Sequence, residues 1–331
     1  MVTVIIPTYM RPQCIKKIID ECIFTYKGNF FTFEIHDSSQ DDKTETIVMS
    51  AMQKVSCLKY FKYSSDILVD TKTLQALRNV LTSHFYVMGD GNLLNFNLLE
   101  FVLNNEDFEN CQVLNIEIPE RKKLYDSMLY YPDDRIIYSQ DYVEFVKQYF
   151  SHMTYWGACI IKKEFLDSAI ETGILDKYKN NIWWIAGVIS ETLWKCKELN
   201  NDINVAVICF SGFSINPSKS KAAHWTETDK YYDFVYKQFN ECVNALPNVY
   251  DEHKKYMIRF FRNDVLTTRK FLFHQRRKGV LTYEKIKLYK KEICVIDGYW
   301  NYMLMLSFVP QFVCQIVDKI WKYIKRWNNN E

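Results

Sequence analysis

The sequence contains no uninterrupted apolar run that approaches the roughly eighteen residues of a membrane-spanning helix. Its N-terminus lacks the basic-then-apolar pattern of a secretory signal, so we expect a cytoplasmic protein. Internal repeats and low-complexity tracts are also missing. With 48% hydrophobic and 16% aromatic residues in a chain of 331, the composition predicts a globular protein with a large core and excludes a disordered one.

The sequence also lacks a cysteine framework. Its ten cysteines include no CxxC pair and show no regular spacing. Most of them sit in apolar runs, as Cys159 and Cys209 do. We therefore predict reduced core cysteines, and neither disulfides nor a structural zinc site.

Neither sign of charge is in strong excess overall, because the formal net charge is +2. The distribution is nevertheless uneven: residues 251–331 hold 17 Lys/Arg against 8 Asp/Glu, which leaves the first 250 residues at −7. A basic C-terminal third predicts an anionic partner surface. Charge alone leaves nucleic acid and membrane lipid both open.

The first two thirds of the chain alternate strand and helix patterns. This alternation predicts right-handed crossovers and an α/β fold whose mostly parallel sheet is flanked by helices. Beyond about residue 215 the patterns are helical throughout. The expected strands are 2–6, 31–36, 58–63, 85–88, 112–118, 159–162 and 204–210, and the expected helices are 12–24, 44–53, 73–81, 96–103, 141–150 and 185–199.

Three polar clusters, at residues 8–11, 37–42 and 89–92, each follow one of the expected strands. Pro7 cannot donate to a sheet ladder and marks the carboxyl end of the first strand. The carboxyl ends of parallel strands meet at one edge, where open α/β sheets bind ligands. We therefore expect the three clusters to form one site.

Four short motifs lie in and around these clusters. They are Val4-Ile-Ile-Pro-Thr-Tyr-Met-Arg11, Asp37-Ser-Ser-Gln-Asp41, Leu77-Arg-Asn79 and Tyr86-Val-Met-Gly-Asp90. In order and rough spacing they resemble the motifs of family 2 glycosyltransferases, which are inverting sugar transferases of GT-A fold. The match is strongest over residues 1–100 and weaker up to about 215. The resemblance implies a GT-A nucleotide-sugar-binding and catalytic domain over residues 1–215, in a bacterial enzyme of polysaccharide synthesis.

The resemblance also implies that residues of these motifs bind the sugar donor. A carboxylate at a strand end, such as Asp37, can accept hydrogen bonds from the base or the ribose of a nucleotide; the alternative is that Asp37 makes an Asx-turn. For Thr8, the alternative to donor binding is a hydrogen bond within its own turn. For Arg11 and Arg78, the alternative is that they are solvated surface residues. The predicted nucleotide-sugar-binding residues are Pro7, Thr8, Tyr9, Arg11, Asp37, Arg78 and Asp90.

The acidic metal motif of the family corresponds here to Gly89-Asp90-Gly91-Asn92. A departing diphosphate needs its charge neutralised, which Mn²⁺ or Mg²⁺ on hard oxygen ligands supplies. This chain keeps the carboxylate of Asp90, but Asn92 is uncharged, so we expect weaker metal binding than in the family; a plain tight turn is the alternative. His224 belongs to a loop of the kind that covers the donor in some related enzymes, and it is a further predicted metal ligand.

Inversion at the anomeric carbon requires a general base beside the acceptor hydroxyl. The family usually places an acidic residue at the start of a helix after the fifth or sixth strand, and Glu191 is the nearest counterpart. If the helix begins earlier, at residues 183–184, Glu191 lies mid-helix and a solvated helix face is the alternative; His152 is the fallback base. Tryptophans stack on sugar faces, although core packing is their more common role. The predicted acceptor-side residues are Trp156, Gly157 and Trp184.

The C-terminal region, residues 216–331, is predicted to be helical and to end in a basic amphipathic helix after Pro310. Such a helix suits the surface of an anionic membrane; packing on its own domain is the alternative. Nucleic acid is disfavoured, because the basic residues interleave with aliphatic side chains. The apolar residues at helical spacing are Phe312, Val313, Ile316, Val317, Ile320, Ile324 and Trp327, and the basic residues on the other faces are Lys319, Lys322, Lys325 and Arg326.

These patterns together predict an inverting, metal-assisted hexosyltransferase that is peripheral on the inner face of the cell membrane. We expect it to move a sugar from a nucleotide-sugar to a saccharide or lipid-linked saccharide acceptor of a cell-surface polysaccharide, with UDP expected from family frequency. A non-catalytic scaffold of this fold in a polysaccharide assembly complex is the alternative, motivated by the sparse metal motif. A sugar nucleotidyltransferase is disfavoured, because no glycine-rich, basic phosphate loop follows the first strand.

Overall fold

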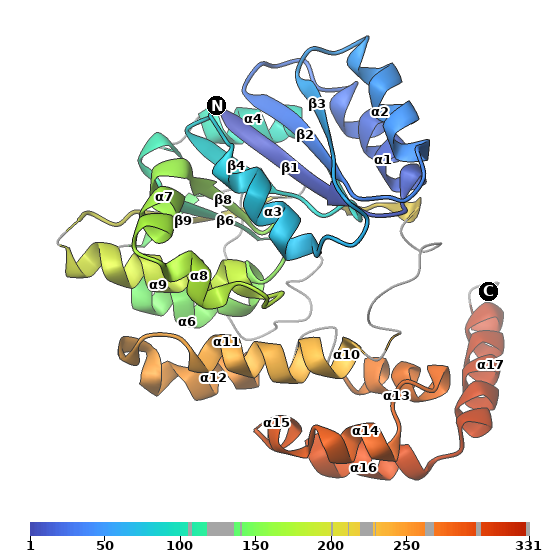
Figure 1. Cartoon of the computed structure of the whole chain (residues 1–331). Coiled ribbons are helices and arrows are strands. Elements are labelled where there is room, and N and C mark those ends of the chain that lie inside the picture. The colour runs from blue at the N-terminus through green and yellow to red at the C-terminus, as the bar shows by residue number, and fades with distance from the viewer. Residues whose placement is uncertain are drawn as a thin grey trace. The chain divides into compact units, whose positions relative to one another are not determined.

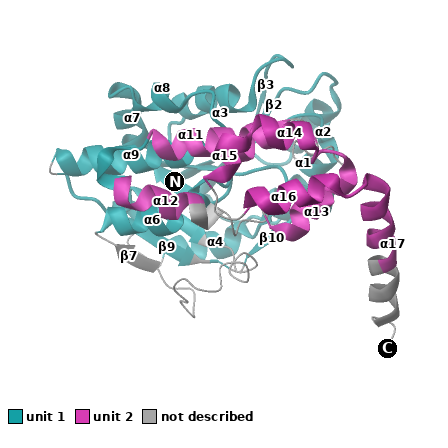
Figure 2. Ribbon diagram, turned by 90° about the horizontal axis from the view of Figure 1, so that it is seen from below, with its two compact units in different colours: residues 1–222, 246–250 teal, residues 223–245, 251–331 magenta. Residues whose placement is uncertain are grey.

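The computed structural model describes residues 1–104, 108–117, 136–139, 141–199, 201–210, 212–218, 228, 230–261, 268–295 and 299–328. The chain divides into two compact units (Figure 2). The first comprises residues 1–222 and 246–250, and the second comprises residues 223–245 and 251–331. The first unit thus extends beyond residue 215, the predicted domain boundary. It also includes the short segment 246–250, which lies within the predicted helical region.

The first unit is built on an eight-stranded sheet of order β3-β2-β1-β4-β8-β6-β9-β7. Within this sheet, β8 and β7 run antiparallel to their neighbours and the other strands share one direction. The prediction of a mostly parallel sheet is therefore confirmed. The strands are β1 Val2–Thr8, β2 Phe31–Asp37, β3 Leu58–Lys62, β4 His84–Val87, β6 Val113–Glu117, β7 Ile136–Ser139, β8 Cys159–Lys162 and β9 Val205–Cys209.

Helices cover both faces of this sheet (Figure 1). Alternate residues of β1 and β2 form one apolar core with α1, the π-helical turn Ile19–Ile23 and α4, while α3 lies against the other face of β1. All seven residues of β1 are buried, as a strand covered on both faces requires. The helices of the first unit are α1 Pro12–Ile18, α2 Lys43–Met52, α3 Val69–Arg78, α4 Phe96–Asn104, α6 Tyr142–Met153, α7 Lys163–Glu171, α8 Ile174–Tyr178 and α9 Trp184–Glu198.

Several short elements escaped the sequence patterns. A second, two-stranded antiparallel sheet pairs β5 Asn92–Leu94 with β10 Phe213–Ile215. Strands of three residues are too short to show alternation, so only the packed structure reveals them. Helix α3 also begins four residues before the expected 73, at Val69, which changes the residues that it brings to the edge of the sheet.

The second unit is helical, as predicted, and local capping explains several of its helix ends. The hydroxyls of Thr268 and Thr282 accept hydrogen bonds from the third residues of α13 and α14, and Gly279 ends α13 with a left-handed φ of 79°. Within the described residues, none of the helices is both long and apolar enough to cross a membrane by itself. The helices are α10 Lys230–Tyr232, α11 Phe239–Asn244, α12 Asp251–Phe261, α13 Arg269–Lys278, α14 Tyr283–Leu288, α15 Lys290–Cys294, α16 Tyr299–Phe308 and α17 Gln311–Asn328, with a π-helical segment Asp233–Gln238 between α10 and α11.

Candidate functional site

The carboxylate of Asp90 lies at the centre of a polar cluster at the carboxyl ends of β1 and β4. The hydroxyl of Thr8 donates a hydrogen bond to Oδ2 of Asp90 at 2.9 Å. The guanidinium of Arg11 donates from Nη1 to Oδ1 of the same carboxylate, also at 2.9 Å. Thr8 and Asp90 are buried, and Arg11 is partly exposed. The first and third polar clusters of the sequence are therefore one cluster in space, as predicted.

Lys72 joins this cluster to the second one, and the sequence analysis did not identify it. It lies in the first half of α3 and is fully buried. Its Nζ donates to the carbonyl oxygen of Thr8 at 2.7 Å and to the hydroxyl of Ser38 at 2.8 Å. Burial lowers the pKa of Lys72 from 10.5 to about 8, although the nearby carboxylates of Asp37 and Asp90 act in the opposite direction. Lys72 thus places a second cation beside Arg11 at the edge of the sheet.

The lowered pKa predicts a pH dependence of stability that Lys72→Met should remove. Between pH 8 and 10.5 the unfolded chain keeps the Lys72 proton and the folded chain has released it, so raising the pH disfavours the unfolded chain. The free energy of unfolding of the wild type should therefore rise relative to K72M by about 3 kcal/mol across this range. Urea unfolding at several pH values measures the difference. The control is Lys16→Met at an exposed position: the wild type should show no such rise relative to K16M, because K16M keeps Lys72.

Asp37 is completely buried, and both of its carboxylate oxygens are occupied. Oδ1 accepts from the backbone N–H of Ser39 at 2.8 Å and from its hydroxyl at 2.5 Å, while Oδ2 accepts from the Tyr60 hydroxyl at 2.9 Å. The bond to the N–H two residues on is the Asx-turn that the sequence left open. The Ser39 hydroxyl in turn accepts from the backbone N–H of Met10 at 2.8 Å. Asp37 therefore shapes the β2 loop and ties it to the loop after β1.

The other predicted donor-binding residues differ in their placement. Pro7 is buried in β1, whereas the side chain of Tyr9 is 47% exposed beside the cluster. Arg78 is the last residue of α3 and is exposed. It lies six residues beyond Lys72, about 9 Å further along the helix axis and towards the amino ends of the strands. The structure does not bring Arg78 to the cluster, because α3 runs antiparallel to β1.

The turn that carries Asp90 and the preceding strand β4 contact two predicted acceptor-side residues. The side-chain amide of Asn92 donates to the carbonyl oxygen of Trp156 at 3.0 Å, and the Tyr86 hydroxyl donates to that of Gly157 at 2.8 Å. Gly157 has a φ of 109°, which side-chain-bearing residues rarely adopt. The structure thus places Trp156 and Gly157 next to the 89–92 turn.

The position of Trp184 corrects one expectation. This side chain is 2% exposed at the start of α9, so its ring offers no face to a sugar and serves the core instead. Sequence patterns do not distinguish a tryptophan that stacks on a ligand from one that fills a core, because both sit among apolar residues.

Asn216 is a second residue that the sequence did not reveal. Its fully buried side-chain amide donates to the carbonyl oxygens of Cys14 at 3.0 Å and Asp90 at 3.1 Å. Its backbone N–H donates to the carbonyl oxygen of Gly91 at 2.9 Å. Asn216 therefore holds the 89–92 turn in place from just beyond β10, at the predicted boundary between the two domains.

Glu191 lies in the middle of α9, because the helix begins at Trp184. The position at a helix start, which the resemblance implied, is not observed, and neither is a solvated face, since Glu191 is 8% exposed. Its Oε2 accepts from Nζ of Lys177 at 2.6 Å and from the Tyr178 hydroxyl at 2.7 Å. The fallback base, His152, is also buried. His224 lies outside the described residues.

The oxygen ligands at the 89–92 turn fit a divalent cation only as part of a shared site. The described residues contain no group of three or more His, Cys, Asp or Glu side chains that could hold a metal ion. The turn offers the Asp90 carboxylate and the side-chain carbonyl of Asn92, whose amide nitrogen is already used. Mg²⁺ is usually held by one or two carboxylates together with substrate phosphates, so this set suits a cation whose other ligands come from the donor.

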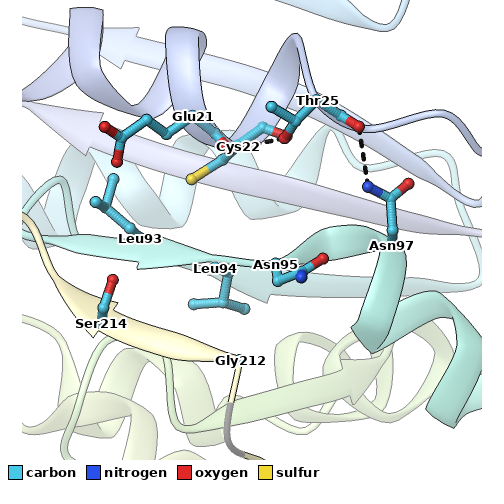
Figure 3. Close-up of a pocket in the computed structure, with 9 residues that line it drawn as sticks. All are labelled: Glu21, Cys22, Thr25, Leu93, Leu94, Asn95, Asn97, Gly212 and Ser214. Carbon is cyan, nitrogen blue, oxygen red and sulfur yellow. Dashed lines mark hydrogen bonds between the residues drawn. The ribbon is translucent and has the colours of Figure 1, made fainter.

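A cavity of about 390 Å³ in the first unit shares no lining residue with this cluster and lies between the π-helical turn and the β5–β10 sheet (Figure 3). Burial raises the pKa of the Cys22 thiol in its wall to about 11, so the thiol is neutral near pH 7. Among the described residues, the cavity lining includes no Lys or Arg that could offer positive charge to a diphosphate. Its lining residues are Glu21, Cys22, Thr25, Leu93, Leu94, Asn95, Asn97, Gly212 and Ser214.

Comparisons with solved structures identify the fold. S. aureus TarS 1–349 matches with a TM-score of 0.52 and 11% sequence identity, over 96% of this chain and 91% of that one. The mannosyltransferase PcManGT from Pyrobaculum calidifontis, in complex with GDP-Man and Mn²⁺, matches with a TM-score of 0.53 and 11% identity, over 97% of this chain and 87% of that one. The chain has the GT-A fold. The predicted fold class is therefore confirmed.

The comparisons by sequence found no relative. No protein-family model matches the chain, and the search of curated proteins returned no match. At 11% identity the structural likeness establishes the fold alone. TarS 1–349 has also been solved in complex with UDP-GlcNAc, and that structure matches with a TM-score of 0.53.

Proposed function

We propose that this protein is an inverting glycosyltransferase that moves a sugar from a nucleotide-sugar, with UDP the expected nucleotide, to a saccharide or lipid-linked saccharide acceptor in cell-surface polysaccharide synthesis. The observation that carries the proposal is the convergence of Thr8, Arg11 and Lys72 around Asp90 at the carboxyl edge of a GT-A sheet. Structures of this fold that match the chain hold UDP-GlcNAc or GDP-Man. The four sequence motifs support the same assignment.

The charges of the cluster suit a diphosphate leaving group. In an inverting transfer the acceptor oxygen bonds to the anomeric carbon as the bond to the diphosphate oxygen breaks, and negative charge develops on the diphosphate. Arg11 and Lys72 are cations at this edge, and a fixed cation stabilises developing charge without reorganising. The acceptor hydroxyl loses its proton to a base, for which Glu191 remains our candidate.

A divalent cation is part of the proposal. Asp90 and Asn92 would hold Mn²⁺ or Mg²⁺ together with the donor phosphates, and His224 would complete the set. Bound there, the cation would neutralise the charge of the leaving diphosphate. Asn92 keeps its side-chain carbonyl available because its amide nitrogen, not its oxygen, contacts Trp156.

A non-catalytic scaffold of the same fold is the second candidate. It is favoured by the sparse ligand set of the 89–92 turn, which has one carboxylate, itself bonded to Thr8 and Arg11. A scaffold would still bind a nucleotide-sugar, but it would not break the bond to the anomeric carbon.

Calorimetry and a turnover assay with a panel of nucleotide-sugars test the proposal. We expect one UDP-sugar to bind more tightly with Mn²⁺ than without it, and to be hydrolysed slowly when no acceptor is present. Binding with no hydrolysis and no transfer would favour the scaffold. Failure of every nucleotide-sugar to bind, with and without Mn²⁺, would contradict both candidates.

A further inference from the structure

Large apolar side chains are exposed along the last two helices of the second unit. Met305 and Phe308 in α16 are 68% and 67% exposed, and Phe312, Ile316 and Ile320 in α17 are 62%, 51% and 53% exposed. Single exposed apolar residues are common, but these five and Val317, which is 46% exposed, lie within sixteen positions and form a patch that soluble surfaces rarely leave uncovered. We call this set the α16–α17 patch.

Specific contacts hold α17 so that the patch faces outwards. Cys314 is fully buried, and Asp318 forms an ion pair with Arg277 of α13. The side chain of Gln311 donates to the carbonyl oxygen of Arg277 at 3.1 Å, and Arg276 donates to that of Val309, in the turn before α17, at 2.8 Å. These bonds fix one side of α17 against α13.

The helical repeat places the three most exposed apolar residues of α17 on its opposite side. At about 100° per residue, Phe312, Ile316 and Ile320 share an arc of about 80°, and Cys314 and Asp318 lie roughly across the helix from that arc. Packing on its own unit, the alternative that the sequence left open, therefore uses the Cys314 side and leaves the patch uncovered by described residues.

The charge of the region that contains the patch favours an anionic partner. Residues 251–331 carry 17 Lys/Arg against 8 Asp/Glu, and the sequence continues beyond the exposed Lys319 with further basic and apolar residues. Helices α16 and α17 meet the length and composition of a membrane span only together, and they are bent by 96° (Figure 1). A fixed corner with apolar side chains and flanking cations fits the interface of an anionic bilayer, where such helices lie in the plane of the headgroups.

We infer that the α16–α17 patch inserts into the surface of an anionic membrane without crossing it, and that this contact holds the enzyme at the membrane. The inference is independent of the sugar-transfer site. A lipid-linked acceptor would be reached from this position, but the membrane contact can be measured without any substrate.

Vesicle flotation with the full chain tests this inference through a matched pair of variants. Ile316→Asp places one negative charge in the patch, and Gln315→Asp places the same charge on an adjacent exposed position outside it. With vesicles of equal parts phosphatidylglycerol and phosphatidylcholine, we expect I316D to lower the membrane partition constant at least about tenfold. Q315D should lower it about threefold or less. Binding should also weaken in pure phosphatidylcholine and at high salt.

Three results would overturn the inference. One is equal binding of I316D and the wild type, and another is equal loss in both aspartate variants. The third is a wild type that does not bind vesicles and forms a dimer in analytical ultracentrifugation, with I316D monomeric. The patch would then be an interface between two copies of the chain. Thermal unfolding of both variants shows whether each is folded, and Ile316→Ser, which adds no charge, replaces I316D if that variant is not.

Discussion

In the Asp90→Asn variant, the rate of sugar transfer is expected to fall about 100- to 1,000-fold. Asparagine has nearly the same shape but no charge, so the bond from the Arg11 guanidinium loses its ionic partner. The same change removes the single carboxylate that the 89–92 turn offers to a cation. Initial rates of nucleoside diphosphate release, measured with the donor that the wild type accepts, give the size of the loss.

Donor binding in the same variant separates the roles of Asp90. If Asp90 holds a cation with the donor phosphates, the tightening of donor binding by Mn²⁺ should disappear in D90N. Asp20→Asn is the control, because Asp20 is an exposed carboxylate in a surface ion pair with Lys16, and its loss should leave rates within about a factor of two. Transfer by D90N at the wild-type rate would refute a function for Asp90 in the reaction.

The Glu191→Gln variant is expected to keep nucleotide binding and to lose transfer by at least about 100-fold. Glutamine still accepts the hydrogen bond from Tyr178 but cannot take a proton from the acceptor hydroxyl. The measurements are calorimetry with UDP and initial rates at saturating donor. Unchanged turnover would eliminate Glu191 as the base.

A matched variant is needed because Glu191 also pairs with Lys177, at 2.6 Å. Lys177→Gln breaks the same ion pair and leaves the carboxylate in place. If Glu191 is the base, K177Q should retain most of its turnover while E191Q does not, even where both lower the free energy of unfolding by a similar amount. Equal losses of turnover would instead assign Glu191 the structural role of linking α8 to α9.

The central part of the site follows from local patterns. Buried strands that end in polar clusters, in the order found here, predicted that the segments after β1 and β4 would meet, and the bond between Thr8 and Asp90 joins them. Asp37 was recognised too, but its sequence is equally typical of a turn, and the structure shows the turn. The local sequence patterns therefore identified the edge of the sheet that carries the polar residues. They did not determine which hydrogen bonds each side chain makes there.

Lys72 and Arg78 show why the remainder could not be predicted. Arg78 lies in the expected helix 73–81 and Lys72 directly precedes it, and basic residues at such positions are normally solvated, so the sequence alone does not distinguish them. The motif favoured Arg78, yet the direction of α3 carries Arg78 to an exposed position and buries Lys72 against the ends of β1 and the β2 loop. The lowered pKa of Lys72 exists only because of that burial.

By itself, the sequence determined most of the strand and helix order of the first unit, the mostly parallel sheet, the edge that carries the polar clusters and the helical character of the C-terminal third. These features depend on backbone periodicity and turn chemistry, which act over a few neighbouring residues. Only the tertiary structure decided which charges meet, as in the contacts of Lys72 and Asn216 across 64 and 126 positions of the chain. Such contacts depend on the direction and packing of whole helices and strands, since the removal of a side chain from water is a property of everything that surrounds it.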